Sequence, residues 1–153
     1  MNAVLKDLST IRPMSEHDLN PVIAVEQAIY PFPWSLGNFR DSLSAGYSCW
    51  IYESGPDLVG YAVMMVAAGE AHLLNLGIAR EWQRRGMGRQ FMHHLLKVAH
   101  DYHAAIMLLE VRPSNTAARR LYRNLGFSDL ATRRKYYPAE HGREDAILMA
   151  RHL

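Results

Sequence analysis

The sequence has one cysteine, Cys49, and no apolar run of the length that crosses a bilayer. A single cysteine excludes an internal disulfide, and a membrane-spanning helix needs about 20 consecutive apolar residues. Residues 1–7 also lack the apolar stretch of a signal peptide. We therefore expect a soluble, cytoplasmic protein without a membrane partner.

Neither sign of charge dominates the chain. Its 17 basic and 15 acidic residues are interspersed and leave a net charge of +2. This balance argues against direct nucleic-acid binding as the main function, since that function usually requires a basic surface. At 153 residues, 49% of them hydrophobic, the chain has enough material for one domain, which we expect to span residues 1–153. The oligomeric state stays open, and a monomer is compatible with the sequence.

Hydrophobic periodicity predicts alternating strands and helices, and therefore an α/β domain. Helices are expected at 16–29, 36–43, about 91–99 and 115–124. Strands are expected at 8–12, 49–53, 58–66, 71–78, 105–111, 127–131 and 145–150. Residues 54–57 should form a hairpin turn, and Tyr136-Tyr137-Pro138 should lie in a loop between the last two strands.

A glycine-containing turn precedes the predicted third helix. Gly86 and Gly88 allow backbone angles and close approaches that other residues exclude. The free N–H groups of the helix start, together with nearby arginines, suit a diphosphate. This candidate anion site consists of Arg84, Arg85, Gly86, Met87, Gly88 and Arg89. The third glycine of a dinucleotide-binding fold and the G-K-[ST] of a phosphate-loop NTPase are missing, but a solvated basic helix start remains an alternative.

Four segments, in their order and spacing, resemble the GNAT superfamily of N-acetyltransferases. They are Asn-Leu-Gly-Ile at 75–78, Gln-x-x-Gly-x-Gly at 83–88, Leu-Glu-Val-Arg-x-Ser-Asn at 109–115 and Leu-Tyr-x-x-Leu-Gly-Phe at 121–127. Within the superfamily, residues 32–34, 110–112, 134–138 and 142–146 look like the RimI family. Its members acetylate the N-terminal alanine of small-subunit ribosomal protein eighteen.

The resemblance implies a GNAT fold, with three α/β/α layers around a mixed, mostly antiparallel sheet that splays where acetyl-CoA binds. It implies acetyl-CoA as co-substrate, a ribosomal-protein N-terminus as acceptor, and direct attack in a ternary complex. By position, Glu110 matches the general base and Tyr122 the general acid. The coenzyme would contact Leu76, Gly77, Ile78, Asn115 and the anion site, while Phe32, Trp34, Tyr136 and Tyr137 would flank the acceptor channel.

Each of these residues also has a purely structural interpretation. Glu110 could end its strand in a salt bridge with Arg112 or another arginine, and Tyr122 could be an ordinary core aromatic at helical spacing. Asn115 is a favoured helix cap, and the aromatic run at 30–34 could simply anchor the first helices. The glycine within strand 71–78 is expected to mark a bulge or a close backbone approach.

No metal is expected. His93, His94, His100 and His103 are not accompanied by a cysteine cluster or H-E-x-x-H, and they should lie on the exposed side of a helix or at its exit. Cys49 is expected to be a small core residue. Two rival functions stay open: acetylation of a lysine side chain or small-molecule amine, and coenzyme binding without catalysis.

Overall fold

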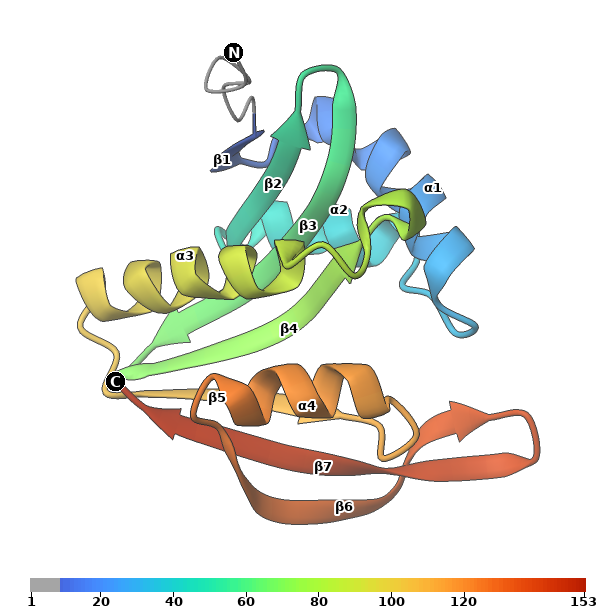
Figure 1. Cartoon of the computed structure of the whole chain (residues 1–153), viewed down its shortest axis with the longest axis vertical. Coiled ribbons are helices and arrows are strands. Elements are labelled where there is room, and N and C mark those ends of the chain that lie inside the picture. Colours follow the sequence, from blue (N-terminus) through green and yellow to red (C-terminus); the bar gives the residue numbers. More distant parts are fainter. Residues whose placement is uncertain (1–8) are drawn as a thin grey trace.

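Seven strands form one sheet in the computed structural model, which describes residues 9–153 (Figure 1). The strands are β1 (Ser9–Pro13), β2 (Ser48–Ser54), β3 (Asp57–Ala67), β4 (Glu70–Ile78), β5 (Ile106–Val111), β6 (Ser128–Ala139) and β7 (Gly142–His152). Their order is β1-β2-β3-β4-β5-β7-β6, and only β4 and β5 pair in parallel. The mixed, mostly antiparallel sheet was therefore predicted correctly, although Leu8 of the first predicted strand lies outside the described residues.

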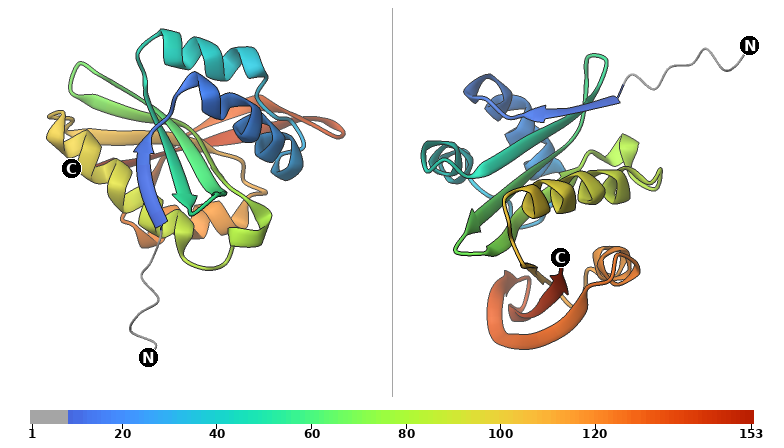
Figure 2. Two further views of the ribbon diagram at one scale, coloured as in Figure 1. Left: turned by 90° about the horizontal axis from the view of Figure 1, so that it is seen from above. Right: turned by 90° about the vertical axis from the view of Figure 1, so that its left-hand side faces the viewer.

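Helices cover both faces of the sheet. Helices α1 (Leu19–Ile29) and α2 (Leu36–Ser44) lie on one face, and α3 (Met87–Asp101) and α4 (Thr116–Asn124) lie on the other (Figure 2). Short 3-10 turns at Glu16–Asp18 and Arg80–Trp82 precede α1 and α3, so the first turn of the helix predicted at 16–29 is 3-10 rather than α. No helix within residues 9–153 is long and apolar enough to cross a membrane.

Two hydrophobic clusters hold the layers together. On the α3 and α4 face, Phe91, Met92 and Leu95 are fully buried against β3, β4 and β5. On the α1 and α2 face, Val22 and Phe39 pack on inward side chains of β2 and β3. Cys49 is buried in this second cluster, as predicted, and burial raises the pKa of its thiol to about 11.

The last two strands form a long hairpin where a loop was expected. Strand β6 continues through Tyr136, Tyr137 and Pro138 to Ala139, and β7 begins at Gly142. The prediction was wrong because β6 is an edge strand that is almost entirely exposed, so its side chains show no apolar alternation. A proline is also tolerated in an edge strand, where its missing N–H can face solvent.

The sheet opens between β4 and β5. Their pairing runs from Glu70 with Ile106 to Leu73 with Leu109 and then stops, although both strands continue. The β3–β4 register shifts at this level, and Leu74 is left unpaired as a bulge. The strands diverge beyond this point (Figure 1), which confirms the predicted splay and places Glu110 immediately after the last pair.

Candidate active site

Glu110 is held in the opening with one carboxylate oxygen free. Its side chain is only 10% exposed, and Oε1 lies 3.8 Å from both His72 Nε2 and Arg133 Nη2. Its Oε2 is buried and has no hydrogen-bond partner in the described part of the chain. The structural alternative of a salt bridge with an arginine is formed, but with Arg133 rather than Arg112, whose Nη1 bonds Glu144 Oε1 at 3.2 Å. A buried carboxylate oxygen without a partner is costly unless a ligand uses it.

Glu110 and Tyr122 approach the opening from opposite faces of the sheet. In β5, Met107, Leu109 and Val111 are buried in the α3 and α4 cluster, so by strand alternation Glu110 points to the other face. Tyr122 belongs to the α3 and α4 cluster and is 8% exposed. The two side chains can therefore act on the same atoms only through the gap between β4 and β5.

Tyr122 combines core packing with an unused hydroxyl group. Its ring packs edge-on against Phe127 with centroids 5.8 Å apart, so the core-aromatic interpretation is correct as far as it goes. Its hydroxyl makes no hydrogen bond to another residue within 9–153. Burial raises the pKa of Tyr122, and Tyr137 nearby raises it further, so the phenol is a proton donor at neutral pH.

Backbone groups of β4 line the other side of the gap. The Tyr30 hydroxyl, reaching in from the loop after α1, donates to the Leu76 carbonyl, and Gln83 Nε2 donates to the Ile78 carbonyl at 2.9 Å. Because the N–H and C=O of one strand residue point to the same edge, the N–H groups of Leu76 and Ile78 also face the gap. They are well placed to bind an acyl oxygen or an amide of a ligand.

Gly77 marks a close approach to its backbone, one of the two expectations for this glycine, rather than a bulge. A Cβ at this position would lie 2.3 Å from Cζ of Tyr61, its cross-strand partner. The glycine thus accommodates a tyrosine ring, and the bulge in this strand is at Leu74 instead. The N–H of Gly77 is directed toward β3, by the same alternation that directs those of Leu76 and Ile78 toward the gap.

The glycine turn is built as an anion site at the start of α3. Gly86 is the N-cap residue and adopts the left-handed conformation with φ 78°, as does Arg84 with φ 62°. The first-turn N–H groups of the helix have no intrahelical acceptor. Arg84, Arg85 and Arg89 are exposed around them, with Arg85 stacked on Trp82 at 5.0 Å. A diphosphate fits the charge and the donors here.

The second glycine of the turn allows close packing between helices. A Cβ on Gly88 would lie 3.3 Å from Cδ2 of Leu121 on α4, which is tighter than nearly all real contacts.

Asn115 is the N-cap of α4, and its side chain accepts from the Ala118 N–H at 3.2 Å. The capping interpretation of Asn115 is therefore correct, and the cap leaves its amide nitrogen free for a ligand.

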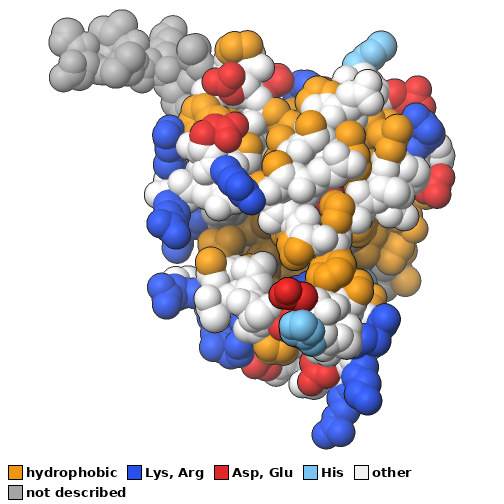
Figure 3. All heavy atoms as spheres, turned by 90° about the vertical axis from the view of Figure 1, so that its right-hand side faces the viewer, with side chains coloured by type: hydrophobic (Ala, Val, Ile, Leu, Met, Phe, Trp, Pro, Cys, Tyr) orange, Lys and Arg blue, Asp and Glu red, His pale blue; other side chains and the backbone are white. Residues whose placement is uncertain are grey.

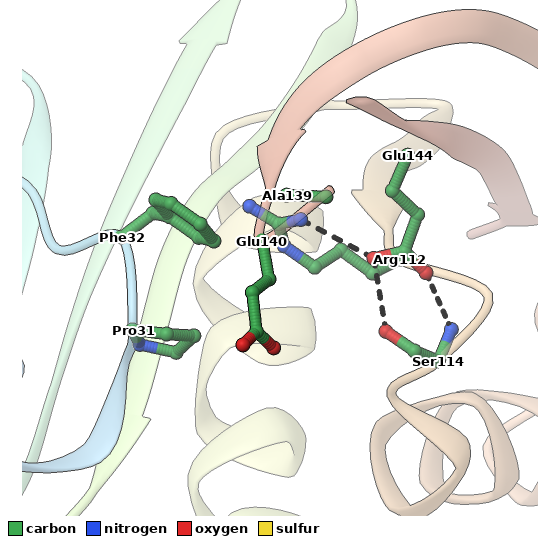
Figure 4. A pocket seen from close by; sticks show the side chains of 7 residues that line it. All are labelled: Pro31, Phe32, Arg112, Ser114, Ala139, Glu140 and Glu144. Atoms are coloured by element: carbon green, nitrogen blue, oxygen red, sulfur yellow. Dashed lines mark hydrogen bonds and ion pairs between the residues drawn. The ribbon is translucent and has the colours of Figure 1, made fainter. Parts of the chain in front are cut away.

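A groove of about 590 Å³ runs between the loop after α1 and the β6–β7 hairpin. It is lined by Pro31, Phe32, Arg112, Ser114, Ala139, Glu140 and Glu144 (Figure 4). The side of the molecule that carries the hairpin shows hydrophobic side chains in a hollow between its upper and lower parts (Figure 3). Arg112, which lines the groove, directly follows the end of β5 and stands two residues after Glu110 in the chain.

Arg112 connects the segments that line this groove. Its guanidinium lies 5.1 Å from the centre of the Phe32 ring and 4.4 Å from that of Tyr137, and it donates to the Pro138 carbonyl at 2.7 Å. Glu144 also accepts from the backbone and hydroxyl of Ser114 at 2.9 and 3.0 Å. These contacts join the loop after α1, the loop after β5 and the hairpin into one wall.

The four predicted acceptor residues do not all lie in this wall. Phe32 lines the groove and Tyr137 supports it through Arg112, while Tyr136 is exposed beside Tyr137, with Arg133 over its ring at 5.2 Å. Trp34 packs against Phe39 in the α1 and α2 core and does not line the groove.

The sequence interpretation missed a buried carboxylate behind the loop. Glu26 is 2% exposed, and its oxygens accept from the Tyr61 hydroxyl at 2.6 Å, Asn75 Nδ2 at 3.2 Å and the Trp34 N–H at 2.9 Å. A signal was present, because Glu26 follows Val22 by four positions on the apolar face of α1. Tyr30 and His72, by contrast, carry no local sequence signal.

The histidines do not form a metal site in the described residues, where no group of three or more His, Cys, Asp or Glu side chains could hold an ion. His94 differs from the expectation of an exposed residue. It is partly buried, with its ring edge-on to Trp50 at 4.5 Å, and burial lowers its pKa. His94 was placed wrongly because its side of α3 also faces β2, where Trp50 reaches over it.

The family model of the acetyltransferase (GNAT) family matches residues 19–127. The chain belongs to the GNAT family. Its members are acetyltransferases that take the acetyl group from acetyl-CoA, so the fold, enzyme class and co-substrate implied by the sequence resemblance are confirmed.

Individual GNAT relatives match nearly the whole chain. The ribosomal protein bS18-alanine N-acetyltransferase of Escherichia coli K12 is 36% identical over 143 residues, which cover 94% of this chain and 97% of that protein. Its counterpart from Haemophilus influenzae is 30% identical, covering 95% and 100%. The crystal structure of the Escherichia coli ribosomal-protein-S18-alanine N-acetyltransferase has a TM-score of 0.89, 36% identity and coverage of 94% and 93%. Ard1 from Thermoplasma volcanium has a TM-score of 0.87 at 25% identity, covering 95% and 98%.

Proposed function

We propose that this GNAT enzyme acetylates the N-terminal α-amino group of ribosomal protein bS18, at its N-terminal alanine. The observation that carries the proposal is the buried carboxylate of Glu110, whose Oε2 has no hydrogen-bond partner in the described residues and which follows the last β4–β5 pair. The relatives named for this reaction match the chain over almost its full length. A ribosomal-protein acceptor would place the reaction in the cytoplasm, and residues 1–153 would work as one domain.

An α-amino group is the acceptor that suits this site. Its ordinary pKa is near 8, so removing its proton at pH 7 costs only about 1.4 kcal/mol. A lysine side chain, near 10.4, asks for about 3 kcal/mol more. A single carboxylate is therefore a sufficient base for the α-amine and a weak one for lysine.

The two substrates would meet in the gap from opposite sides. The coenzyme would lie on the α3 and α4 side, with its diphosphate on the N–H groups of Met87, Gly88 and Arg89 and its arm along β4. The peptide would enter by the groove past Phe32. Holding both reactants in line supplies much of the rate in a ternary complex.

Acetyl transfer then follows in one direct attack. Glu110 takes a proton from the amine, whose nitrogen forms the new bond to the thioester carbon. The N–H groups of Leu76 or Ile78 stabilise the oxygen that becomes negative, an interaction typically worth about 3 kcal/mol. As the carbon–sulfur bond breaks, the Tyr122 hydroxyl protonates the leaving thiolate. The acylated nitrogen then loses its second proton, which restores the Tyr122 phenol and leaves a neutral amide.

Two peptides test the acceptor directly. One begins with alanine and carries the bS18 N-terminal sequence, and the other is its N-terminally blocked copy with an internal lysine. We expect acetyl transfer, followed by mass spectrometry, to the first peptide alone. Transfer only to the second peptide, or to small amines, would favour the rival enzyme class, and tight coenzyme binding without transfer to any amine would favour a non-catalytic module.

The cellular target needs a separate measurement. In cells that lack this chain, intact-mass analysis of ribosomal proteins should show bS18 without its acetyl group, about 42 Da lighter. An unchanged mass would exclude bS18 as the target and leave the GNAT family assignment intact. Restoring the gene should return the acetyl group, whereas restoring it with Glu110→Gln should not.

A further inference from the structure

The carboxylate of Glu110 has two basic neighbours at equal distance. His72 Nε2 and Arg133 Nη2 each lie 3.8 Å from the same oxygen, Oε1. These are ion-pair contacts somewhat longer than a hydrogen bond, so a small rotation of the Glu110 or His72 side chain would bring the two groups into hydrogen-bond range. Both neighbours contact Oε1, and neither uses Oε2.

Strand pairing places His72 beside Glu110. His72 on β4 pairs with Leu108 on β5, two residues before Glu110, so both side chains lie on the same face of adjacent parallel strands. The cross-strand partner of His72 on β3 is Met65, which brings no charge. Among the described residues, Glu110 on β5 is the charged group in contact with this imidazole, and Arg133 on β6 contacts the same oxygen of Glu110.

Only one of these neighbours can receive a proton. A guanidinium stays charged at all working pH values, so Arg133 cannot accept one. Tyr137 also lies near Glu110, but its pKa is raised to about 12, chiefly by burial, so it is already protonated. A neutral imidazole, by contrast, has one ring nitrogen that accepts a proton and one that donates a proton. The His72 side chain is 27% exposed against 10% for Glu110, so it also has better access to water.

We propose that His72 receives, across its contact with Glu110 Oε1, the proton that Glu110 takes from the amine and passes it to solvent. The proposal rests on the proposed function, since it needs Glu110 to act as the base. The amine loses one proton to Glu110, Glu110 transfers one to His72 and returns to a carboxylate, and His72 releases one to bulk water. His72 acts through Glu110 and does not touch the substrate.

The surroundings of the two groups favour this transfer. Glu110 is only 10% exposed, and peptide and coenzyme bound in the gap would keep bulk water away from it. The more exposed imidazole of His72 then provides a route for the proton to solvent.

The test compares His72→Ala with Arg133→Ala, a matched control at the same distance from the same oxygen. We expect His72→Ala to lower kcat about tenfold or more near pH 7, to leave KM for peptide and acetyl-CoA nearly unchanged, and to lose less at pH 9, where the amine is already neutral. Added imidazole should restore much of the rate that His72→Ala loses. It should restore none of any rate that Arg133→Ala loses. His72→Gln, which keeps a polar side chain in the strand, should be equally slow at wild-type thermal stability.

Different outcomes separate this proposal from the proposed function. One outcome would overturn the role of His72 alone. In it, the wild type acetylates the alanine peptide, Glu110→Gln is impaired, and His72→Ala matches the wild type at every pH. Glu110 would then still act as the base, but His72 would not receive its proton. A loss of activity in His72→Ala that added imidazole does not restore would also overturn the proposal. So would a loss of activity that accompanies a lower melting temperature in both His72 variants, because His72 would then have a structural role. Because the two residues act in series, the double variant Glu110→Gln His72→Ala should be no slower than Glu110→Gln.

Discussion

The Tyr61 hydroxyl donates to Glu26 Oε1 across 2.6 Å in the core behind the acceptor loop. Glu26 also accepts from the Trp34 N–H, so this pair connects β3 with the loop that carries Phe32. Burial and the adjacent carboxylate raise the pKa of Tyr61, which keeps the phenol protonated as a donor. The same ring occupies the space left by Gly77.

Tyr61→Phe removes that donor and leaves Glu26 Oε1 with only the longer bond from Asn75. Leaving a buried charged acceptor short of a partner costs about 1–3 kcal/mol, so the free energy of unfolding should fall by that amount. Urea titration measures it. Tyr102→Phe, at a tyrosine that is 67% exposed, is the control and should change nothing. Equal stability of the two variants would show that Glu26 does not depend on this bond.

Glu110→Gln keeps the size of the side chain and removes the base. We expect kcat to fall about 10²- to 10⁴-fold at pH 7, and less at pH 9, because the α-amine then needs no base. Acetyl-CoA binding, followed by calorimetry, should be nearly unchanged. Full activity across this pH range would remove Glu110 from the role of base.

Tyr122→Phe removes the proposed acid and keeps the packing against Phe127. Single-turnover acetyl transfer should slow about a hundredfold, with unchanged peptide affinity. The coenzyme thiol, with an ordinary pKa near 8.5, is a tolerable leaving group, so the loss should shrink as the pH rises toward that value. Single-turnover rates equal to wild type would exclude Tyr122 as the acid.

Arg84→Gly tests the anion site without adding strain, because glycine readily adopts the φ of 62° found there. An exposed charge contributes up to about 1 kcal/mol, so Kd for acetyl-CoA should rise by up to about fivefold. The effect should weaken in about 0.5 M salt, because the charge is screened. Arg40→Ala, on α2 across the sheet, is the matched control. A salt-independent loss would point to a conformational cause.

Asp18 offers a test of stability against pH. Arg12 donates to both oxygens of Asp18 at 2.9 and 2.8 Å, and this hydrogen bonding lowers the pKa of Asp18 below its usual 3.8. A lowered folded pKa stabilises the protein above the unfolded pKa, and the contribution is lost as the pH falls through the folded value. Asp18→Asn should therefore cost about 1 kcal/mol of unfolding free energy at pH 7 and progressively less below about pH 4.

The matched control for that variant is Asp101→Asn, which breaks the exposed pair with Lys97 on α3. Its effect at pH 7 should be smaller, since both partners are well solvated. A penalty for Asp18→Asn that stays constant down to pH 2 would show that Asp18 stabilises the fold by packing rather than by charge.

Most of the order of elements could be read from local patterns. Apolar residues at helical spacing predicted α3, and the glycine turn before it was recognisable because a left-handed N-cap and free N–H groups are local properties. Glu110 attracted attention because it is a charged residue at the end of an apolar strand. The β6–β7 hairpin was missed because an exposed edge strand carries no such pattern.

The sequence by itself determined the family, the anion-binding turn and the types of residue at the site, because those signals depend on neighbours along the chain. The tertiary structure alone decided their partners. It paired Arg112 with Glu144 rather than Glu110, turned Trp34 into the core, and set His72 beside Glu110 across two parallel strands. Such contacts depend on strand register and on the loss of pairing after Leu73 and Leu109, which no local stretch of sequence encodes.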